Sequence, residues 1–422
     1  MTANASERRG IVRTLTVGTA GFLRSIWSVL GMTLLLLLLI ECGFRIKQQL
    51  SGELVSNPPI PPSYRNADWY APFTAEYDAT RQQRWKPYVY FGRWPSFQGR
   101  YVNIDEFGRR VTPQPTSPAE PAATVFFFGG STMWGTAQRD SQTIAAEASR
   151  RLQREAGEGR RIAVTNFGES GYVTTQGVLE LMLQLRAGNR PDVVVFFDGI
   201  NDVFATVQAG APGVPQNEAK RVGEFTMGRQ LDRFSYARGV RKDLKSAGLL
   251  VVTLVKQFAL VDWVLQLAPP TPPALISVDS ATRSTVRVYA ENMKMVEGLA
   301  GKYGFTAVYV WQPSIHSTQK PLTAFEQSIR RWIESDSTQN LMRAVHLAAP
   351  PLLDAAMSEV APGRFVNASA LFQNDSSDVY FDRIGHNTEA SVPVIVDAFW
   401  PALKAAVSAR KAPDGARSVP FR

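Results

Sequence analysis

Residues 123–132 read ATVFFFGGST, and this stretch decides the fold. The run Val125–Phe128 is short and wholly apolar, which is typical of a parallel strand buried on both faces. A glycine turn with Ser131 follows it, and a helical pattern begins at Ser141. Strand, turn and helix in this order predict a βα unit that places Ser131 at the carboxyl edge of a sheet.

The same alternation continues toward the end of the chain. Four further apolar runs are predicted as strands: Ile162–Phe167, Val193–Phe197, Ala307–Trp311 and Arg364–Asn367. Helical spacing predicts helices at Ser141–Glu155, at Thr174–Arg186 and near 281–302, 338–360 and 389–408. Five such units predict an α/β fold, with a doubly wound, mainly parallel five-stranded sheet between two helical layers.

The composition divides the chain into segments: a basic N-terminus (1–24), an apolar segment (25–44), a linker and irregular cap region (45–120), the α/β domain (121–408) and a basic tail expected to be disordered (409–422). An insertion at 205–280 separates the third and fourth strands, and a connection of this length is usually a lid or subdomain. Its apolar stretch 248–267 contains Lys256 and Asp262, which favours an amphipathic helix over a second membrane crossing.

Residues 25–44, with the leucine run Leu34–Leu39, reach the length that a helix needs to cross a bilayer. A cleaved signal peptide is the alternative, but no small-x-small cleavage site follows the run. Four arginines precede the segment, whereas only Arg45 and Lys47 follow closely. The positive-inside rule therefore predicts a single-pass protein with a cytoplasmic N-terminus and a periplasmic or otherwise extracytoplasmic domain.

The formal net charge of +9 is concentrated at the two ends of the chain. Four arginines against one glutamate give residues 1–24 a charge of +3, and residues 404–422 carry +4. The nearly balanced body predicts no nucleic-acid partner, and the basic ends favour a membrane surface. The single cysteine, Cys42, excludes an intrachain disulfide and Cys-based metal clusters. We expect neither a metal nor a nucleotide cofactor.

Polar motifs follow the first three predicted strands and precede the last helix: Gly129–Thr132, Asn166–Gly171, Gly199–Asp202 and Asp382–His386. A serine at a strand end exposes its hydroxyl beside a helix N-terminus, which stabilises negative charge. A glycine lets a backbone N–H approach a ligand, and an asparagine amide can donate to an oxyanion. Each motif alone also fits a helix cap or an ordinary turn.

The chain has only three histidines. His346 lies within a predicted helix and is expected to be packed or solvated. His316 follows the fourth strand and could face the same cleft as Ser131, but it has no acidic neighbour. His386 has Asp382 nearby to orient its ring, and we therefore predict that His386 is the general base.

The order, spacing and strand-end positions of these motifs resemble those of the SGNH, or GDSL-like, hydrolases, over residues from about Val125 to Phe399. The resemblance, to the membrane-anchored bacterial type, implies that Ser131 is the nucleophile, with His386 as base and Asp382 as its acid. It also implies an oxyanion hole made by Ser131, Gly171 and Asn201.

Two departures from the family pattern stand out. Gly130 occupies the position before the nucleophile, where family members often have Asp. Asp382 and His386 are separated by three residues instead of two, which leaves Asp378 as an alternative partner for the histidine.

The resemblance implies a membrane-tethered acyl or acetyl esterase that acts through an acyl-serine intermediate on O-acylated glycans of the cell envelope or exterior. With a sugar hydroxyl as acceptor, the same residues would make an O-acetyltransferase. A non-catalytic, anchored binding or assembly protein is the third interpretation. The presence of all four residue types (Ser, Gly, Asn and His) argues against it.

Overall fold

The computed structural model describes residues 27–43, 60–115, 120–157, 160–218, 221–222, 225 and 276–409. They fall into two units: the apolar helix Trp27–Gly43 belongs to one, and the residues from 60 onward belong to the other. The apolar stretch 248–267, the basic N-terminus 1–24 and nearly all of the basic tail 409–422 lie outside the described residues.

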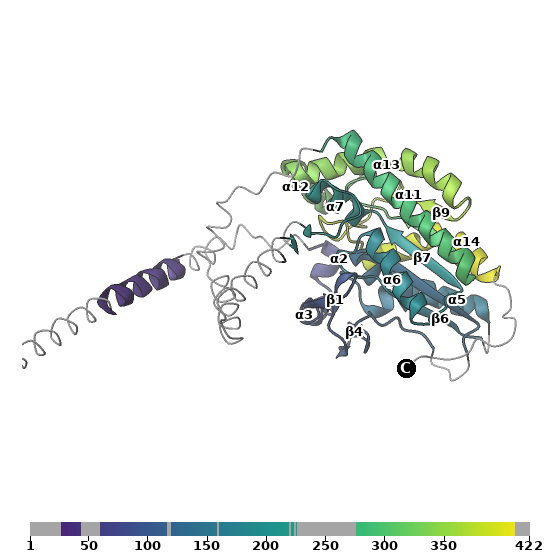
Figure 1. Ribbon diagram of the computed structural model, residues 1–422, viewed down its shortest axis with the longest axis horizontal. Helices are drawn as coiled ribbons and strands as arrows, with labels where there is room; N and C mark the ends of the chain where they lie inside the picture. The colour runs from purple at the N-terminus through teal and green to yellow at the C-terminus, as the bar shows by residue number, and fades with distance from the viewer. Residues whose placement is uncertain are drawn as a thin grey trace, which may run out of the picture. The chain divides into compact units, whose positions relative to one another are not determined.

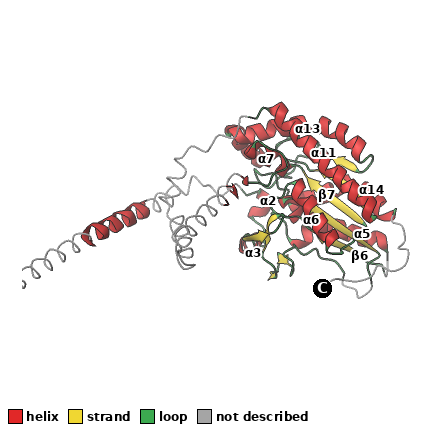
Figure 2. Ribbon diagram, in the orientation of Figure 1, coloured by secondary structure: helices red, strands yellow, loops and turns green. Residues whose placement is uncertain are grey.

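A five-stranded parallel sheet with the order β6-β5-β7-β8-β9 forms the centre of the second unit (Figures 1 and 2). Its strands are β5 (Ala123–Gly129), β6 (Ile162–Asn166), β7 (Val193–Asp198), β8 (Thr306–Trp311) and β9 (Phe365–Asn367). The chain winds outward from β5 to β6 and then crosses back to β7. The predicted doubly wound α/β fold is therefore confirmed, and the winding reverses at β5, where such sheets bind ligands.

Helices cover both faces of this sheet (Figure 1). One face carries α6 (Thr174–Arg186), α7 (Ile200–Ala209), α11 (Val278–Tyr303) and α13 (Ser337–Val360). The other carries α5 (Ile144–Ala156), α12 (Ala324–Ser335) and α14 (Val392–Ser408), with the 3₁₀ turns Asp140–Gln142 and Glu389–Ser391 before α5 and α14. Side chains of β5 alternate between the two cores, Phe127 on the α5 side and Phe128 on the α6 side. Burial on both faces explains the uninterrupted apolar run.

Within the α/β domain, the helices α7 and α12 were not expected from the sequence. α7 begins one residue before Asn201 and continues into the predicted insertion, ending at Ala209. α12 is polar on average, but it buries Phe325, Ile329 and Ile333 at helical spacing. Its start carries a capping box, in which Thr323 and Glu326 satisfy each other's backbone N–H groups. A threonine followed three residues later by a glutamate is a sequence signal for the start of a helix.

Residues 60–115 form two helices and two hairpins on the same unit: α2 (Pro62–Arg65), α3 (Tyr70–Ala79), β1 (Gln83–Lys86) with β2 (Tyr90–Arg93), and β3 (Phe97–Gln98) with β4 (Asn103–Ile104). Aromatic rings hold this segment in place. Tyr64 packs edge-on against Phe381 at 5.2 Å, and Tyr77 against Trp134 at 5.6 Å. The aromatic residues that gave no periodic pattern in the sequence are thus the packing surface of the segment.

The helix Trp27–Gly43 exposes its leucines Leu34–Leu39. Among the described residues, one helix is long and apolar enough to cross a membrane, and it is Glu389–Ser408. Because α14 within it buries Ile395, Phe399 and Leu403 in the domain core, it is a core helix of this unit. The membrane anchor at 25–44 and its orientation stay predictions.

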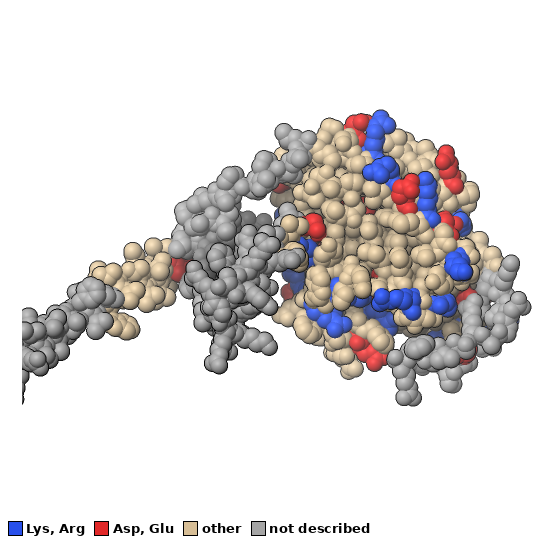
Figure 3. Space-filling view, in the orientation of Figure 1, with Lys and Arg blue, Asp and Glu red and all other residues tan. Residues whose placement is uncertain are grey.

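Charged side chains are unevenly spread over the face drawn in Figure 3. Lys and Arg gather in a band across the lower half of the described domain, whereas acidic and basic residues mix in the upper half. In the described domain as a whole, several cations form ion pairs, among them Lys86 with Glu180 at 2.7 Å and Lys404 with Glu155 at 2.9 Å. The absence of a nucleic-acid partner stays a prediction.

One buried carboxylate, Glu326, organises the loop before the last helix. Its Oε1 accepts bonds from the N–H groups of Val379 (3.0 Å) and Tyr380 (3.3 Å). Its Oε2 accepts from the ammonium of Lys320 at 2.5 Å, and both side chains are fully buried. This carboxylate therefore joins α12 to the loop that leads to Asp382 and His386.

We expect Glu326→Ala to reduce the free energy of unfolding by about 3–5 kcal/mol, because it leaves the Lys320 charge buried without its partner. Urea unfolding followed by circular dichroism measures this difference. Glu334→Ala, at an exposed position of the same helix, should change it by less than about 0.5 kcal/mol. Equal unfolding free energies for the two variants would contradict the role of Glu326.

Candidate active site

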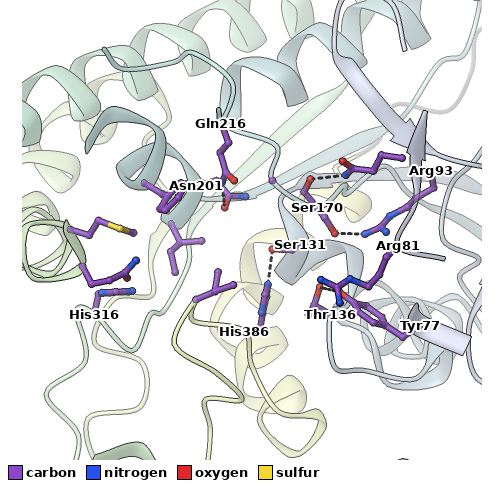
Figure 4. Close-up of a pocket in the computed structure, with 17 residues that line it drawn as sticks. Tyr77, Arg81, Arg93, Ser131, Thr136, Ser170, Asn201, Gln216, His316 and His386 are labelled. Atoms are coloured by element: carbon purple, nitrogen blue, oxygen red, sulfur yellow. Dashed lines mark hydrogen bonds between the residues drawn. The ribbon is translucent and has the colours of Figure 1, made fainter. Parts of the chain in front are cut away.

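Ser131 is the first residue of the short helix α4 (Ser131–Trp134), which follows β5 directly after Gly130. Its side chain is nearly buried and lines a pocket of about 360 Å³ (Figure 4). At the first helical position its backbone N–H has no acceptor within the helix. The hydroxyl and the backbone N–H of Ser131 thus both lie at the carboxyl edge of the sheet.

His386 lies between Ser131 and Asp382. Its Nε2 is 2.7 Å from the Ser131 Oγ (Figure 4). Its Nδ1 is 2.6 Å from Asp382 Oδ2. Asp378, the alternative acid, instead accepts a bond from the Thr323 hydroxyl. The structure therefore places Asp382, and not Asp378, against the imidazole.

A tight turn accommodates the extra residue between Asp382 and His386. Asp382 Oδ1 accepts bonds from the N–H groups of Ile384 (3.0 Å), Gly385 (3.1 Å) and His386 (3.2 Å). Gly385 adopts a φ of 95°, and a Cβ there would lie 2.5 Å from Ile200. Only glycine fits this position, and the turn brings the second oxygen of Asp382 to the ring.

Burial alone would raise the pKa of Asp382. The neighbouring His386 and the N–H donors of the turn outweigh it and hold that pKa below its usual value of 3.8. Asp382 is therefore ionised at neutral pH, which keeps the Nδ1 proton of His386 directed toward it and leaves Nε2 facing Ser131.

Gly171 and Asn201, the other two predicted oxyanion residues, line the same pocket as Ser131. Gly171 has a φ of 83°, a conformation that favours glycine. The Asn201 amide donates to the Tyr172 carbonyl at 2.8 Å and accepts from Gln216 at 2.9 Å, which fixes its orientation. One amide hydrogen of Asn201 remains for a ligand.

Gly130, the residue before the nucleophile, lies close to the Asn201 side chain. A Cβ on Gly130 would lie 2.1 Å from the Asn201 side-chain nitrogen. A side chain at position 130 would therefore require the Asn201 amide to shift away from it.

Sequence reasoning missed several residues around the site. Gln216 orients Asn201, and Glu169 lies in the motif Asn166–Gly171, whose predicted site residue is Gly171. Tyr77, Arg81 and Arg93 line the pocket from the segment 60–115, which carried no periodic signal. Among the described residues, no three His, Cys, Asp or Glu side chains are grouped in a way that could hold a metal ion.

His316 and His346 form a buried stacked pair beside the pocket, with ring centroids 5.5 Å apart. His316 lines the pocket, as the sequence suggested it could, but it contacts neither Ser131 nor an acid through a bond that would orient it for catalysis. Burial lowers the pKa of His316 to about 4 and that of His346 well below 6.5. Both rings are therefore neutral in the folded protein.

A second buried pair lies behind Asn201. Burial raises the pKa of Asp202 to about 6 and that of Asp198 well above its usual value, the latter also because Asp202 is close. Asp202 Oδ1 accepts the N–H of Thr174 at 3.0 Å, which connects the starts of α6 and α7. Asp202 therefore links the helix start that presents Asn201 to the start of α6.

The GDSL-like Lipase/Acylhydrolase family model matches residues 127–349, more than half of the chain, beginning in β5 and including Ser131, Gly171 and Asn201. The chain belongs to this family. The match confirms the predicted GDSL-like membership. Because the family name describes ester hydrolysis, the match also supports the prediction that the chain is a hydrolase.

Solved structures similar to the chain include an acetyl xylan esterase, AlAXEase (12% identity, covering 66% of this chain and 99% of that one, TM-score 0.35). Another is the psychrotrophic esterase EstA of Pseudoalteromonas sp. (10% identity, 68% and 99%, TM-score 0.34). A third is TesA (13% identity, 67% and 99%, TM-score 0.34). A comparison with curated proteins found no match.

The buried pair His316 and His346 predicts that the folded state loses stability at acidic pH. Between pH 6.5 and 4 the unfolded chain binds a proton at each ring, while the folded rings stay neutral, so stability falls as the pH falls through this range. We expect His346→Leu to remove about 2 kcal/mol of the loss between pH 7.5 and pH 5. Urea unfolding at both pH values measures it. An identical loss in the parent and the variant would refute this explanation.

Proposed function

We propose that this protein is a membrane-tethered serine esterase that removes acyl groups, above all acetyl groups, from O-acylated glycans outside the cytoplasm. The observation that carries the proposal is the continuous line of hydrogen bonds from Asp382 through His386 to Ser131. In a member of an acylhydrolase family, this arrangement is suited to activating the serine hydroxyl.

In the proposed reaction, His386 Nε2 takes the proton of Ser131 as its Oγ attacks the ester carbonyl. The N–H groups of Ser131 and Gly171 and the Asn201 amide bind the oxyanion that develops. The protonated His386 then gives its proton to the leaving alcohol, and Ser131 remains as an acyl ester. A water molecule, deprotonated by His386, attacks this ester and releases the acid, while Asp382 stays ionised and stabilises the imidazolium.

The pocket lining suggests where the two parts of the ester lie. The lining includes the apolar side chains of Ile200, Phe204 and Met342 as well as Tyr77 and Arg81. Figure 4 shows Tyr77 and Arg81 on the opposite side of Ser131 from His316. The acyl group fits against the apolar part of the lining. Hydroxyl-rich carriers such as sugars match the aromatic and hydrogen-bonding side.

The proposed location rests on the apolar helix Trp27–Gly43 and on the arginines that precede it. An anchored domain remains close to polymers that are themselves attached to the envelope. Tethering raises the effective concentration of enzyme at such a surface, which suits an immobile substrate.

We expect the full-length protein in detergent to hydrolyse 4-nitrophenyl acetate and Ser131→Ala to abolish this activity. Asp382→Asn should lower kcat by about 10⁴-fold, because the imidazole loses its orienting charge. Asn201→Ala should cost about 10²–10³-fold. Asp378→Asn, which alters the carboxylate bonded to Thr323, is the control and should retain near-parental kcat. Full activity of Ser131→Ala would end the assignment.

Product analysis on acetylated and bare glycans separates the remaining alternatives. Free acetate in water supports the esterase, and transfer of acetyl groups to bare glycan supports an O-acetyltransferase. If neither activated esters nor a fluorophosphonate probe modify Ser131, the protein is a non-catalytic binding or assembly protein.

We also expect the protein to remain in the membrane fraction after a carbonate wash, and a variant lacking residues 1–44 to be released. A C-terminal alkaline phosphatase fusion, active only outside the cytoplasm, reports the orientation. A fusion that is inactive, with a cytoplasmic reporter active at the same position, would overturn the proposed topology.

A further inference from the structure

The hairpin β1–β2 contacts the loop that carries Gly171, although it precedes the region of the chain that matches the family. Its last residue, Arg93, lies against Glu169 and Ser170 and lines the pocket. Both members of the Arg93–Glu169 ion pair are buried, with 3% and 7% of their side chains exposed. A buried ion pair beside a candidate oxyanion donor calls for a physical explanation, because desolvating two charges is costly.

All three guanidinium nitrogens of Arg93 donate hydrogen bonds to other residues of the chain. Its Nε donates to Glu169 Oε1 (3.1 Å), its Nη2 to the Ser170 hydroxyl (2.5 Å) and its Nη1 to the Thr80 carbonyl (2.8 Å). Its backbone N–H donates to the second oxygen of Glu169 at 3.0 Å. Three of these four bonds hold the two residues that immediately precede Gly171, and the fourth holds the guanidinium to the Thr80 carbonyl.

Arg93 also lies against the helix that starts with the nucleophile. Its guanidinium carbon is 4.5 Å from the centre of the Trp134 ring, and Trp134 ends α4. The loop also passes close to α4: a Cβ on Gly168 would lie only 2.7 Å from the backbone nitrogen of Trp134. One side chain thus contacts both the element carrying Ser131 and the element carrying Gly171.

A second bond from the same hairpin reaches the other oxyanion residue. The Tyr172 hydroxyl donates to the Phe91 carbonyl at 2.6 Å, and the Tyr172 carbonyl accepts from the Asn201 amide at 2.8 Å. The strand β2 therefore touches the loop on both sides of Gly171 and, through Tyr172, the amide of Asn201.

We propose that Arg93 is a positioning residue, which holds the Gly171 N–H at the distance from Ser131 that an oxyanion requires. This inference rests on the proposed serine esterase function. An oxyanion hole stabilises a transition state only when its donors are held in place before the reaction. The segment before the family-matched region is then a working part of the active site in this chain.

The test replaces the ion pair with apolar residues of similar volume. Arg93→Met alone leaves Glu169 buried without its partner, so it destabilises the fold; the double variant Arg93→Met, Glu169→Met removes both charges and is expected to fold. For the full-length double variant, we expect kcat for 4-nitrophenyl acetate to fall about 10–10³-fold, with KM changed less than about threefold. The inhibition constant of a boronic acid that mimics the tetrahedral intermediate should rise in parallel.

A more exposed Arg–Glu pair at the far edge of the sheet serves as the control. Arg364 forms a bidentate ion pair with Glu297, with both hydrogen bonds at 2.7 Å. Neither residue lines the pocket. The double variant Arg364→Met, Glu297→Met should leave kcat within about twofold of the parent, whatever it does to the melting temperature. Arg93→Lys, which keeps the charge but cannot reach Glu169, Ser170 and Thr80 together, should recover part of the lost kcat.

Unchanged kcat and boronic acid binding in a folded Arg93→Met, Glu169→Met variant would refute the positioning role while leaving the esterase proposal intact. A parent protein that hydrolyses no ester and reacts with no fluorophosphonate would contradict the esterase proposal and this inference with it. A fall in kcat that is matched by the Arg364 and Glu297 control would reduce Arg93 to a general stabilising residue.

Discussion

Burial of β5 on both faces is the constraint on which this structure depends. A strand that is apolar on both sides can present polar groups only where it ends, and here it ends in Gly129-Gly130-Ser131. Because the neighbouring parallel strands end at the same edge, the loops with Gly171 and Asn201 reach the same place. The sheet thus sets the position of three of the site residues before any side-chain bond forms.

The remaining part of the site depends on buried polar groups that hold loops against this edge. Glu326 secures the chain ahead of Asp382, and Glu169 secures the loop ahead of Gly171. Each is paired with a buried cation, Lys320 or Arg93. Such pairs add little net stability compared with apolar packing, but they permit few alternative geometries. The domain therefore combines an apolar sheet core with buried ion pairs that fix the loops carrying the site residues.

Much of the fold could be predicted because its signals are local. The five predicted strands lie within a residue or two of the observed ones, and the bounds of α6 agree with the prediction. The exceptions have physical causes. α12 is polar on average, and its capping box is the stronger sequence signal for it. Residues 60–115 pack through aromatic rings such as Tyr64 and Tyr77, whose contacts follow no helical or strand period.

By itself the sequence determined the class of fold, the order of its strands along the chain, and the placement of Ser131, Gly171 and Asn201 at strand ends. These properties follow from the alternation of apolar runs and turns, which adjacent residues encode. Only the tertiary structure decided that Asp382 rather than Asp378 contacts His386, that the Asn201 amide lies against Gly130, and that Arg93 reaches the Gly171 loop. The first outcome depends on the turn between Asp382 and His386 and on the bond that Thr323 makes to Asp378. The other two depend on which atoms of distant parts of the chain come within contact distance in the folded domain, and no local pattern records that distance.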